Sequence, residues 1–231
     1  MQSKEITTIN TKKIALYIAV LLLSLIAIHI IFEINLNNSH NDNLIRVACI
    51  GNSITYCGYP VELQVNLGIN YTVRNFGLNS TTVLLNTELP YMYQFDFTRA
   101  KYFLPDIAIV MLGTNDARTD HFKSIENFIS DYSKLINELQ ALKNHPTIFL
   151  AIPPPIFPND FSLENENLVE GIIPRIKQIA NEKDLPIINV YSALENHPEY
   201  FSDDGVHPNS EGSTVIANVV YNAIINFIET S

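Results

Sequence analysis

Three residues that could together activate a hydroxyl group stand in two short segments of the chain. Ser53 lies in segment 51–55 (GNSIT), and Asp204 and His207 lie in segment 204–209 (DGVHPN). A serine hydroxyl is a poor nucleophile at neutral pH, so it needs a base within reach and a group that fixes the tautomer of that base. One tight turn can hold Asp204 against Nδ1 of His207 while Nε2 points at Ser53. This pattern predicts nucleophilic acyl transfer.

Acyl transfer also needs hydrogen-bond donors for the oxyanion of the tetrahedral intermediate. Gly77 and Asn115 follow two later apolar runs, so the backbone N–H groups of Ser53 and Gly77 and the side-chain amide of Asn115 are candidate donors. Each residue has a plain structural alternative. Ser53 would suit a helix cap, Gly77 a tight turn, and Asn115 a turn closed by its own side chain. Their joint placement favours the catalytic interpretation.

The elements that would position these residues follow from the hydrophobic pattern after Leu44. Short apolar runs predict five strands. The runs are Ile45 to Ile50, Tyr71 to Phe76, Ile107 to Leu112, Thr147 to Ile152 and Ile187 to Val190. Apolar residues three and four apart predict amphipathic helices over Phe122 to Leu142, Leu168 to Ala180 and Thr214 to Ile228.

Strands that alternate with helices indicate a parallel sheet with helices on both faces, and such sheets bind ligands beyond the carboxyl ends of their strands. Ser53 follows the first predicted strand, Gly77 the second and Asn115 the third, while Asp204 and His207 precede the last helix. All the candidate residues are therefore expected at one edge of the sheet.

Ser53, Gly77, Asn115 and His207, in this order, resemble the four name-giving residues of the SGNH, or GDSL-like, hydrolase family. The resemblance implies a three-layer α/β/α sandwich of flavodoxin-like topology with a five-stranded parallel sheet. It also implies a serine esterase that needs no cofactor and no metal. Ser53, Asp204 and His207 would form the triad, and Ser53, Gly77 and Asn115 the oxyanion hole.

The resemblance extends over about residues 46–228 and includes one departure. The family usually has aspartate before the nucleophilic serine, where this chain has Asn52. That aspartate is not the triad acid, so activity is expected to survive. The competing Gly-x-Ser-x-Gly elbow of the α/β-hydrolases is not met, because Thr55 stands at its last position.

Four segments resemble bacterial carbohydrate acetylesterases, including sialate O-acetylesterase-like proteins. They are 49–55 (CIGNSIT), 74–77 (RNFG), 111–116 (MLGTND) and 153–155 (PPP). The expected substrate is an acylated small molecule or glycan, with an O-acetyl ester on a carbohydrate as the first expectation. Nothing in the chain indicates its oligomeric state.

Two other functions stay open. A short-chain acyl esterase or lysophospholipase at the membrane could use the aromatic residues between Gly77 and the third strand as an acyl groove, although core packing is the simpler role for most of those rings. They are Tyr91, Tyr93, Phe95, Phe97, Tyr102 and Phe103. A glycan-binding SGNH domain without turnover is the third interpretation.

The N-terminal part has the pattern of a membrane anchor. Residues 14–32 are apolar apart from Tyr17, Ser24 and His29, with two lysines just before them. This length can span a bilayer as a helix, and the lysines place residues 1–13 in the cytoplasm. Residues 33–43 have the composition of a polar linker, and residues 44–231 are the expected hydrolase domain, periplasmic or extracellular. A cleaved export signal is the alternative, which would make the domain a secreted protein.

The formal net charge of −10 disfavours nucleic acid as a partner. The two cysteines, Cys49 and Cys57, are expected to be free thiols, and no cluster of cysteine and histidine has the spacing of a metal site. His121 is expected in a loop or at the surface, with no assigned role.

Overall fold

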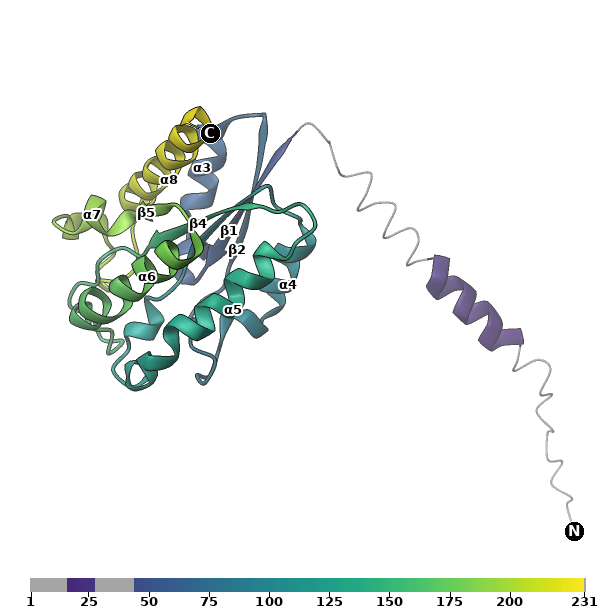
Figure 1. The fold of residues 1–231 in the computed structure, drawn as a ribbon, viewed down its shortest axis with the longest axis horizontal. Helices are drawn as coiled ribbons and strands as arrows, with labels where there is room; N and C mark the ends of the chain where they lie inside the picture. Colours follow the sequence, from purple (N-terminus) through teal and green to yellow (C-terminus); the bar gives the residue numbers. More distant parts are fainter. Residues whose placement is uncertain (1–15, 28–43, 231) are drawn as a thin grey trace, which may run out of the picture. The chain divides into compact units, whose positions relative to one another are not determined.

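The computed structural model describes residues 16–27 and 44–230 (Figure 1). The residues from Ile45 onward form a unit of their own. Residues 16–27 are helical, whereas the rest of the predicted anchor 14–32, residues 1–13 and the linker 33–43 lie outside the described residues. Among the helices described, none has the length and apolar character needed to cross a membrane. The anchor therefore stays a prediction.

The five predicted strands form one parallel sheet in the order β2-β1-β3-β4-β5. The strands are β1 (Ile45–Gly51), β2 (Tyr71–Gly77), β3 (Ile107–Met111), β4 (Thr147–Ile152) and β5 (Ile187–Asn189). The chain leaves β1 toward β2 and then returns to place β3 on the other side of β1. This reversal is the switch point at which doubly wound sheets open a ligand crevice.

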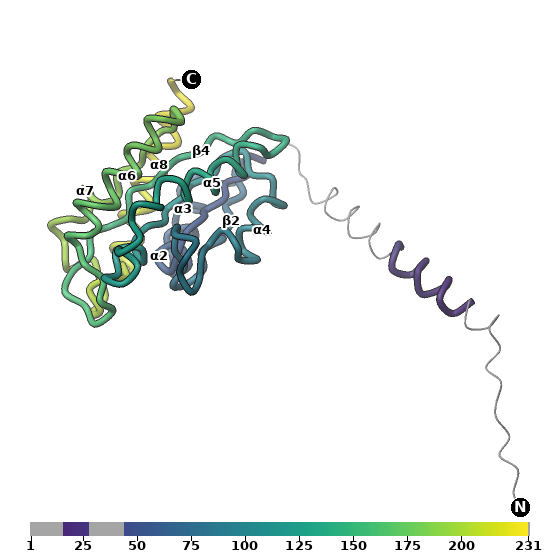
Figure 2. The backbone as a smooth tube through the Cα atoms, turned by 60° about the horizontal axis from the view of Figure 1, so that its bottom comes forward, coloured from purple at the N-terminus to yellow at the C-terminus, as the bar shows by residue number. Residues whose placement is uncertain are grey.

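Helices cover both faces of the sheet, which confirms the predicted three-layer α/β/α architecture (Figures 1 and 2). Ala48 and Ile50 of β1 belong to one core, and Val47 and Cys49 to the other, because successive side chains of a strand point to opposite faces. The first core is closed by α4 (Phe95–Tyr102), α5 (Phe128–Gln140) and α6 (Ile173–Lys183), and the second by α3 (Tyr59–Leu67), α7 (Val190–Leu194) and α8 (Ser210–Thr230).

Two predicted helices begin irregularly. The segment expected to form one helix from Phe122 starts as a 3₁₀ helix, η3 (His121–Asn127), with a kink at Ser124, and becomes α-helical only in α5. The segment expected from Leu168 starts as a π-helical turn, η4 (Asn167–Ile172), before α6. Pro174 has no N–H with which to continue regular α-helical bonding there.

Candidate active site

Ser53 stands at the first turn after β1. It begins the short helix α2 (Ser53–Tyr56), and Oδ1 of the buried Asn52 accepts a 3.0 Å hydrogen bond from the N–H of Ile54. Asn52 therefore caps α2, a role that needs only an acceptor oxygen. An amide supplies that oxygen as well as a carboxylate does, which gives a physical reason why asparagine fits the position where the family usually has aspartate.

A chain of two hydrogen bonds joins Ser53, His207 and Asp204. Nε2 of His207 lies 2.8 Å from Oγ of Ser53, and Nδ1 lies 2.7 Å from Oδ2 of Asp204. An ionised carboxylate only accepts hydrogen bonds, so the proton of the neutral ring sits on Nδ1 and leaves Nε2 free to accept from Ser53. This is the protonation state that a base for Ser53 needs.

Asp204 is held ionised by its surroundings. Its Oδ1 accepts hydrogen bonds from the backbone N–H groups of Val206 and His207, both at 2.9 Å. Partial burial opposes ionisation, but these two bonds and the His207 ring together hold the pKa of Asp204 below its usual value. The carboxylate is therefore charged throughout the neutral range.

The turn that carries Asp204 and His207 depends on a glycine. Gly205 has a φ of +71°, in the left-handed region, and a Cβ there would lie 2.3 Å from the carbonyl oxygen of Pro158. Its own carbonyl accepts a 2.8 Å hydrogen bond from the N–H of Phe157. The loop after β4 thus braces the turn, and only glycine fits the contact.

Asn115 reaches the same site from the loop after β3. It begins the 3₁₀ turn η2 (Asn115–Ala117), lines the same pocket as Ser53 and His207, and donates from Nδ2 to the carbonyl of Thr81 at 2.9 Å. A side-chain amide carries two N–H donors, and the bond to Thr81 uses only one of them.

Gly77 does not take the place predicted for it. Its N–H donates to Oδ1 of Asn75 at 2.8 Å, and it is not among the residues that line the pocket. A Cβ at Gly77 would lie 2.3 Å from the backbone nitrogen of Tyr56, so the glycine allows the end of β2 to pack against α2. The expectation that its N–H serves the oxyanion hole does not fit this geometry.

Ser80, three residues further on, lines the pocket instead. It has a φ of +62°, which is uncommon for serine. Within the described part of the chain, its backbone N–H has no acceptor. No sequence pattern pointed to this residue, because serine is not a type that indicates a left-handed backbone.

Asp116 ties the loop after β2 to the loop after β3. Its fully buried carboxylate accepts hydrogen bonds from the backbone N–H groups of Val83, at 3.0 Å, and Leu84, at 2.8 Å. Burial raises the pKa of Asp116 to about 6, and the bonds from Leu84 and Val83 only partly offset that rise. The clamp fixes the loop that carries Ser80 relative to Asn115.

The pocket around Ser53 has a volume of about 370 Å³. Polar and apolar side chains share its wall. They are Ser53, Cys57, Asn79, Ser80, Asn115, Arg118, His121, Phe161, Leu163, Val206 and His207. The six aromatic residues considered for an acyl groove are absent from this wall, and Tyr91 and Phe97 are buried in the core.

Both cysteines are free thiols, as predicted. Cys49 is buried in β1, and Cys57 lies at the pocket. Burial, with a smaller effect from the charge of Asp204, raises the pKa of the Cys57 thiol. The thiolate needed for a competing nucleophile is therefore disfavoured.

Comparison with known proteins identifies the family. The model of the GDSL-like Lipase/Acylhydrolase family matches residues 49–215, most of the chain. The chain belongs to this family. It is thus a member of a family of carboxylic ester hydrolases, as the sequence resemblance implied.

One curated relative of this GDSL-family chain is an acetylxylan esterase from Xylanibacter ruminicola, 32% identical over 209 residues. The match covers 79% of this chain but 44% of the relative, so the chain spans less than half the length of that protein.

Two solved structures share the fold at lower identity. A carbohydrate acetylesterase from Sinorhizobium meliloti has a TM-score of 0.62 at 17% identity, covering 79% of this chain and 99% of that one. An aryl esterase from M. smegmatis has a TM-score of 0.63 at 18% identity, covering 78% and 98%.

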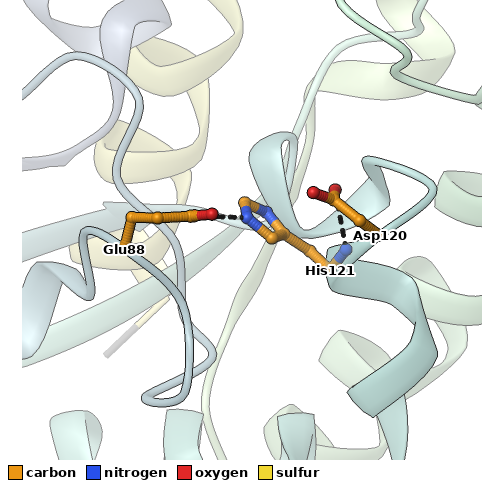
Figure 3. A group of neighbouring side chains, drawn as sticks. All are labelled: Glu88, Asp120 and His121. Atoms are coloured by element: carbon orange, nitrogen blue, oxygen red, sulfur yellow. Dashed lines mark hydrogen bonds and ion pairs between the residues drawn. The ribbon is translucent and has the colours of Figure 1, made fainter.

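One wall of the pocket in this GDSL-family chain holds a charged cluster that sequence reasoning missed. His121, expected in a loop or at the surface, is only 8% exposed, and Glu88 and Asp120 lie beside it (Figure 3). The three residues could present metal ligands, but Arg118 pairs with both carboxylates and lies 2.7 Å from Nε2 of His121. The guanidinium cation occupies the place that a metal ion would need.

Proposed function

We propose that this chain is a serine esterase that hydrolyses O-acyl esters, O-acetyl esters on a carbohydrate in particular. The observation that carries the proposal is the hydrogen-bonded triad. Nε2 of His207 lies 2.8 Å from Oγ of Ser53, and Nδ1 of His207 lies 2.7 Å from Oδ2 of Asp204. Membership in the GDSL-like family supports the same reaction.

In the proposed mechanism, His207 takes the proton of Ser53 as Oγ attacks the ester carbonyl carbon. The tetrahedral intermediate then collapses, its bond to the alcohol oxygen breaks, and His207 gives the proton to the leaving alcohol. A water molecule attacks the acyl-enzyme with His207 again acting as base. The acid leaves and Ser53 regains its proton.

We assign the oxyanion hole to the backbone N–H groups of Ser53 and Ser80 and to Nδ2 of Asn115. All three residues line the pocket, from the loops after β1, β2 and β3. Ser80 replaces Gly77 in this assignment, because the Gly77 N–H already donates to Asn75. Preorganised donors of this kind stabilise the charge that develops on the carbonyl oxygen.

The pocket supports a small ester. Its volume of about 370 Å³ lies near the lower end of the roughly 300–1,000 Å³ typical of ligand pockets. Asn79 and Arg118 offer polar groups for sugar hydroxyls, and Phe161, which is 47% exposed, offers a ring for a sugar face. The acetylxylan esterase relative supports a carbohydrate ester as well.

The first experiment compares the wild type with Ser53→Ala on p-nitrophenyl acetate. We expect turnover in the wild type and a loss of roughly 10³-fold or more in the variant, because the nucleophile is gone. Ser133→Ala, on α5 and outside the pocket wall, is the matched control and should keep wild-type turnover. Absence of turnover in the wild type would contradict the esterase proposal and favour a glycan-binding domain.

The acyl preference separates the acetylesterase from a short-chain esterase or lysophospholipase. We expect kcat/KM to fall from p-nitrophenyl acetate to the octanoate, and acetylated xylo-oligosaccharides to be deacetylated. A rise from acetate to octanoate would overturn the acetylesterase assignment.

We further propose that residues 14–32 anchor the protein in a membrane, with residues 44–231 outside the cytoplasm. The apolar run and the lysines before it support this proposal. Ultracentrifugation of cell extracts tests it, and we expect the full chain in the membrane pellet. Recovery in the supernatant with a new N-terminus beyond residue 32 would instead indicate a cleaved export signal.

A further inference from the structure

We infer that His121 is a positioning residue for the oxyanion hole, acting through the backbone carbonyl of Asn115. The inference rests on the proposed function, because it concerns how the assigned donors Asn115 and Ser80 are held. His121 begins η3 and reaches back to Asn115 at the start of η2, in the loop after β3.

The bond between His121 and Asn115 has a fixed direction. Nδ1 of His121 lies 2.8 Å from the backbone oxygen of Asn115. A carbonyl oxygen can only accept, so Nδ1 must carry a proton and donate. The same carbonyl receives only a longer bond, at 3.3 Å, from the N–H of Arg118. The hydrogen bond from His121 is therefore the shorter of the two bonds that hold this peptide group.

The other ring nitrogen of His121 contacts a residue of the loop after β2. Nε2 of His121 lies 2.8 Å from Oε2 of Glu88 (Figure 3). It also lies 2.7 Å from a guanidinium nitrogen of Arg118. A neutral ring accepts there from Arg118, and a protonated ring donates to Glu88. Because Nδ1 carries its proton in both states, the bond to Asn115 is kept whichever partner Nε2 takes.

His121 thus connects the two loops that carry the assigned oxyanion donors. Asn115 follows β3, whereas Glu88 belongs to the loop between β2 and η1 (Tyr91–Tyr93), which also carries Ser80. The amide of Asn115 is held to this same loop by its bond to Thr81. A displacement of about 1 Å in a catalytic group can cost up to 10²-fold in rate, so loss of the Nδ1 bond that holds the Asn115 peptide group should affect kcat.

The test uses two substitutions that each keep one half of the imidazole. His121→Asn places an amide N–H near the position of Nδ1, and His121→Gln places its amide near Nε2. We expect His121→Asn to keep kcat on p-nitrophenyl acetate within about threefold, and His121→Gln to lower it by roughly 10- to 100-fold. KM should change by less than about twofold in both, since oxyanion donors act mainly on the charge that develops in the transition state.

A boronic acid that forms a tetrahedral adduct with Ser53 gives a second readout. Its affinity should fall in His121→Gln in parallel with kcat, because the adduct uses the same oxyanion donors. A residue needed only for stability would lower Tm in both variants and leave kcat and boronate affinity unchanged in the folded fraction. If His121→Gln does not fold, His121→Ala supplies the same comparison with His121→Asn.

Glu88→Gln is the matched control, since it alters only the Nε2 side of the ring. Glu88 is exposed, and the variant should keep kcat within about twofold. Wild-type kcat in His121→Gln, or an equal loss in Glu88→Gln, would overturn the inference. The proposed function is judged separately, by the loss of turnover in Ser53→Ala.

Discussion

Replacing Asp204 by asparagine should reverse the tautomer of His207. Oδ1 of Asp204 accepts two backbone N–H bonds of 2.9 Å, and Oδ2 accepts the Nδ1–H of His207 at 2.7 Å. The asparagine carbonyl will keep the Oδ1 position, because the opposite orientation would lose two hydrogen bonds of about 1 kcal/mol each and set N–H donors against each other. The NH₂ group of the introduced asparagine then faces Nδ1.

A donor facing Nδ1 forces the ring proton onto Nε2, where it blocks acceptance of the Ser53 proton. Loss of a hydrogen bond to a charged group costs about 1.5–3 kcal/mol. The wrong tautomer adds to this cost, and in triads of this kind the combined loss is about 10⁴-fold in kcat, or about 5.4 kcal/mol of activation free energy. The assay is kcat on p-nitrophenyl acetate at pH 7.5. Tm should change little, because both backbone bonds persist.

The adjacent carboxylate provides a matched control for this experiment. Asp203 is exposed, and Asp203→Asn removes the same charge one residue away. We expect it to keep kcat within about twofold, since exposed charges are strongly screened. If Asp204→Asn kept more than about a tenth of wild-type kcat, the assignment of Asp204 as the group that fixes the His207 tautomer would be refuted.

Three more predictions concern the loops around Ser53. Asn115→Ala should lower kcat by roughly 10²-fold, and unchanged turnover would remove Asn115 from the mechanism. Ser80→Gly should keep kcat within about threefold, because the N–H is retained and glycine accepts a φ of +62°; a large loss would show that the hydroxyl is needed. Folded Asp116, with its pKa raised from 3.8 to about 6, holds its proton more tightly than the unfolded chain does. It should therefore lower the free energy of unfolding by about 2 kcal/mol as pH rises from 4 to 7. Asp116→Asn lacks this titration. Denaturant unfolding of the wild type and the variant at several pH values between 4 and 7 measures the difference. An identical pH dependence of the two proteins would contradict the prediction.

The local pattern of the sequence determined the sheet and the edge at which the candidate residues meet. Runs such as Ile107 to Leu112 are too apolar and too short for anything but strands buried on both faces. Segment 204–209 places Asp204 and His207 on one turn, and the alternation of strands and helices predicts that turn at the same edge of the sheet as Ser53. These properties depend on residue type and spacing within a few positions.

The tertiary structure alone decided which residues of the loop after β2 line the pocket. Gly77 looked suited to the oxyanion hole, but its missing Cβ serves a contact with α2, and its N–H belongs to Asn75. Ser80 adopts the left-handed backbone at the pocket, and His121 is buried against Asn115. The backbone conformation of a single serine and the burial of a single ring depend on how loops from distant parts of the chain pack together, and no local pattern encodes that packing.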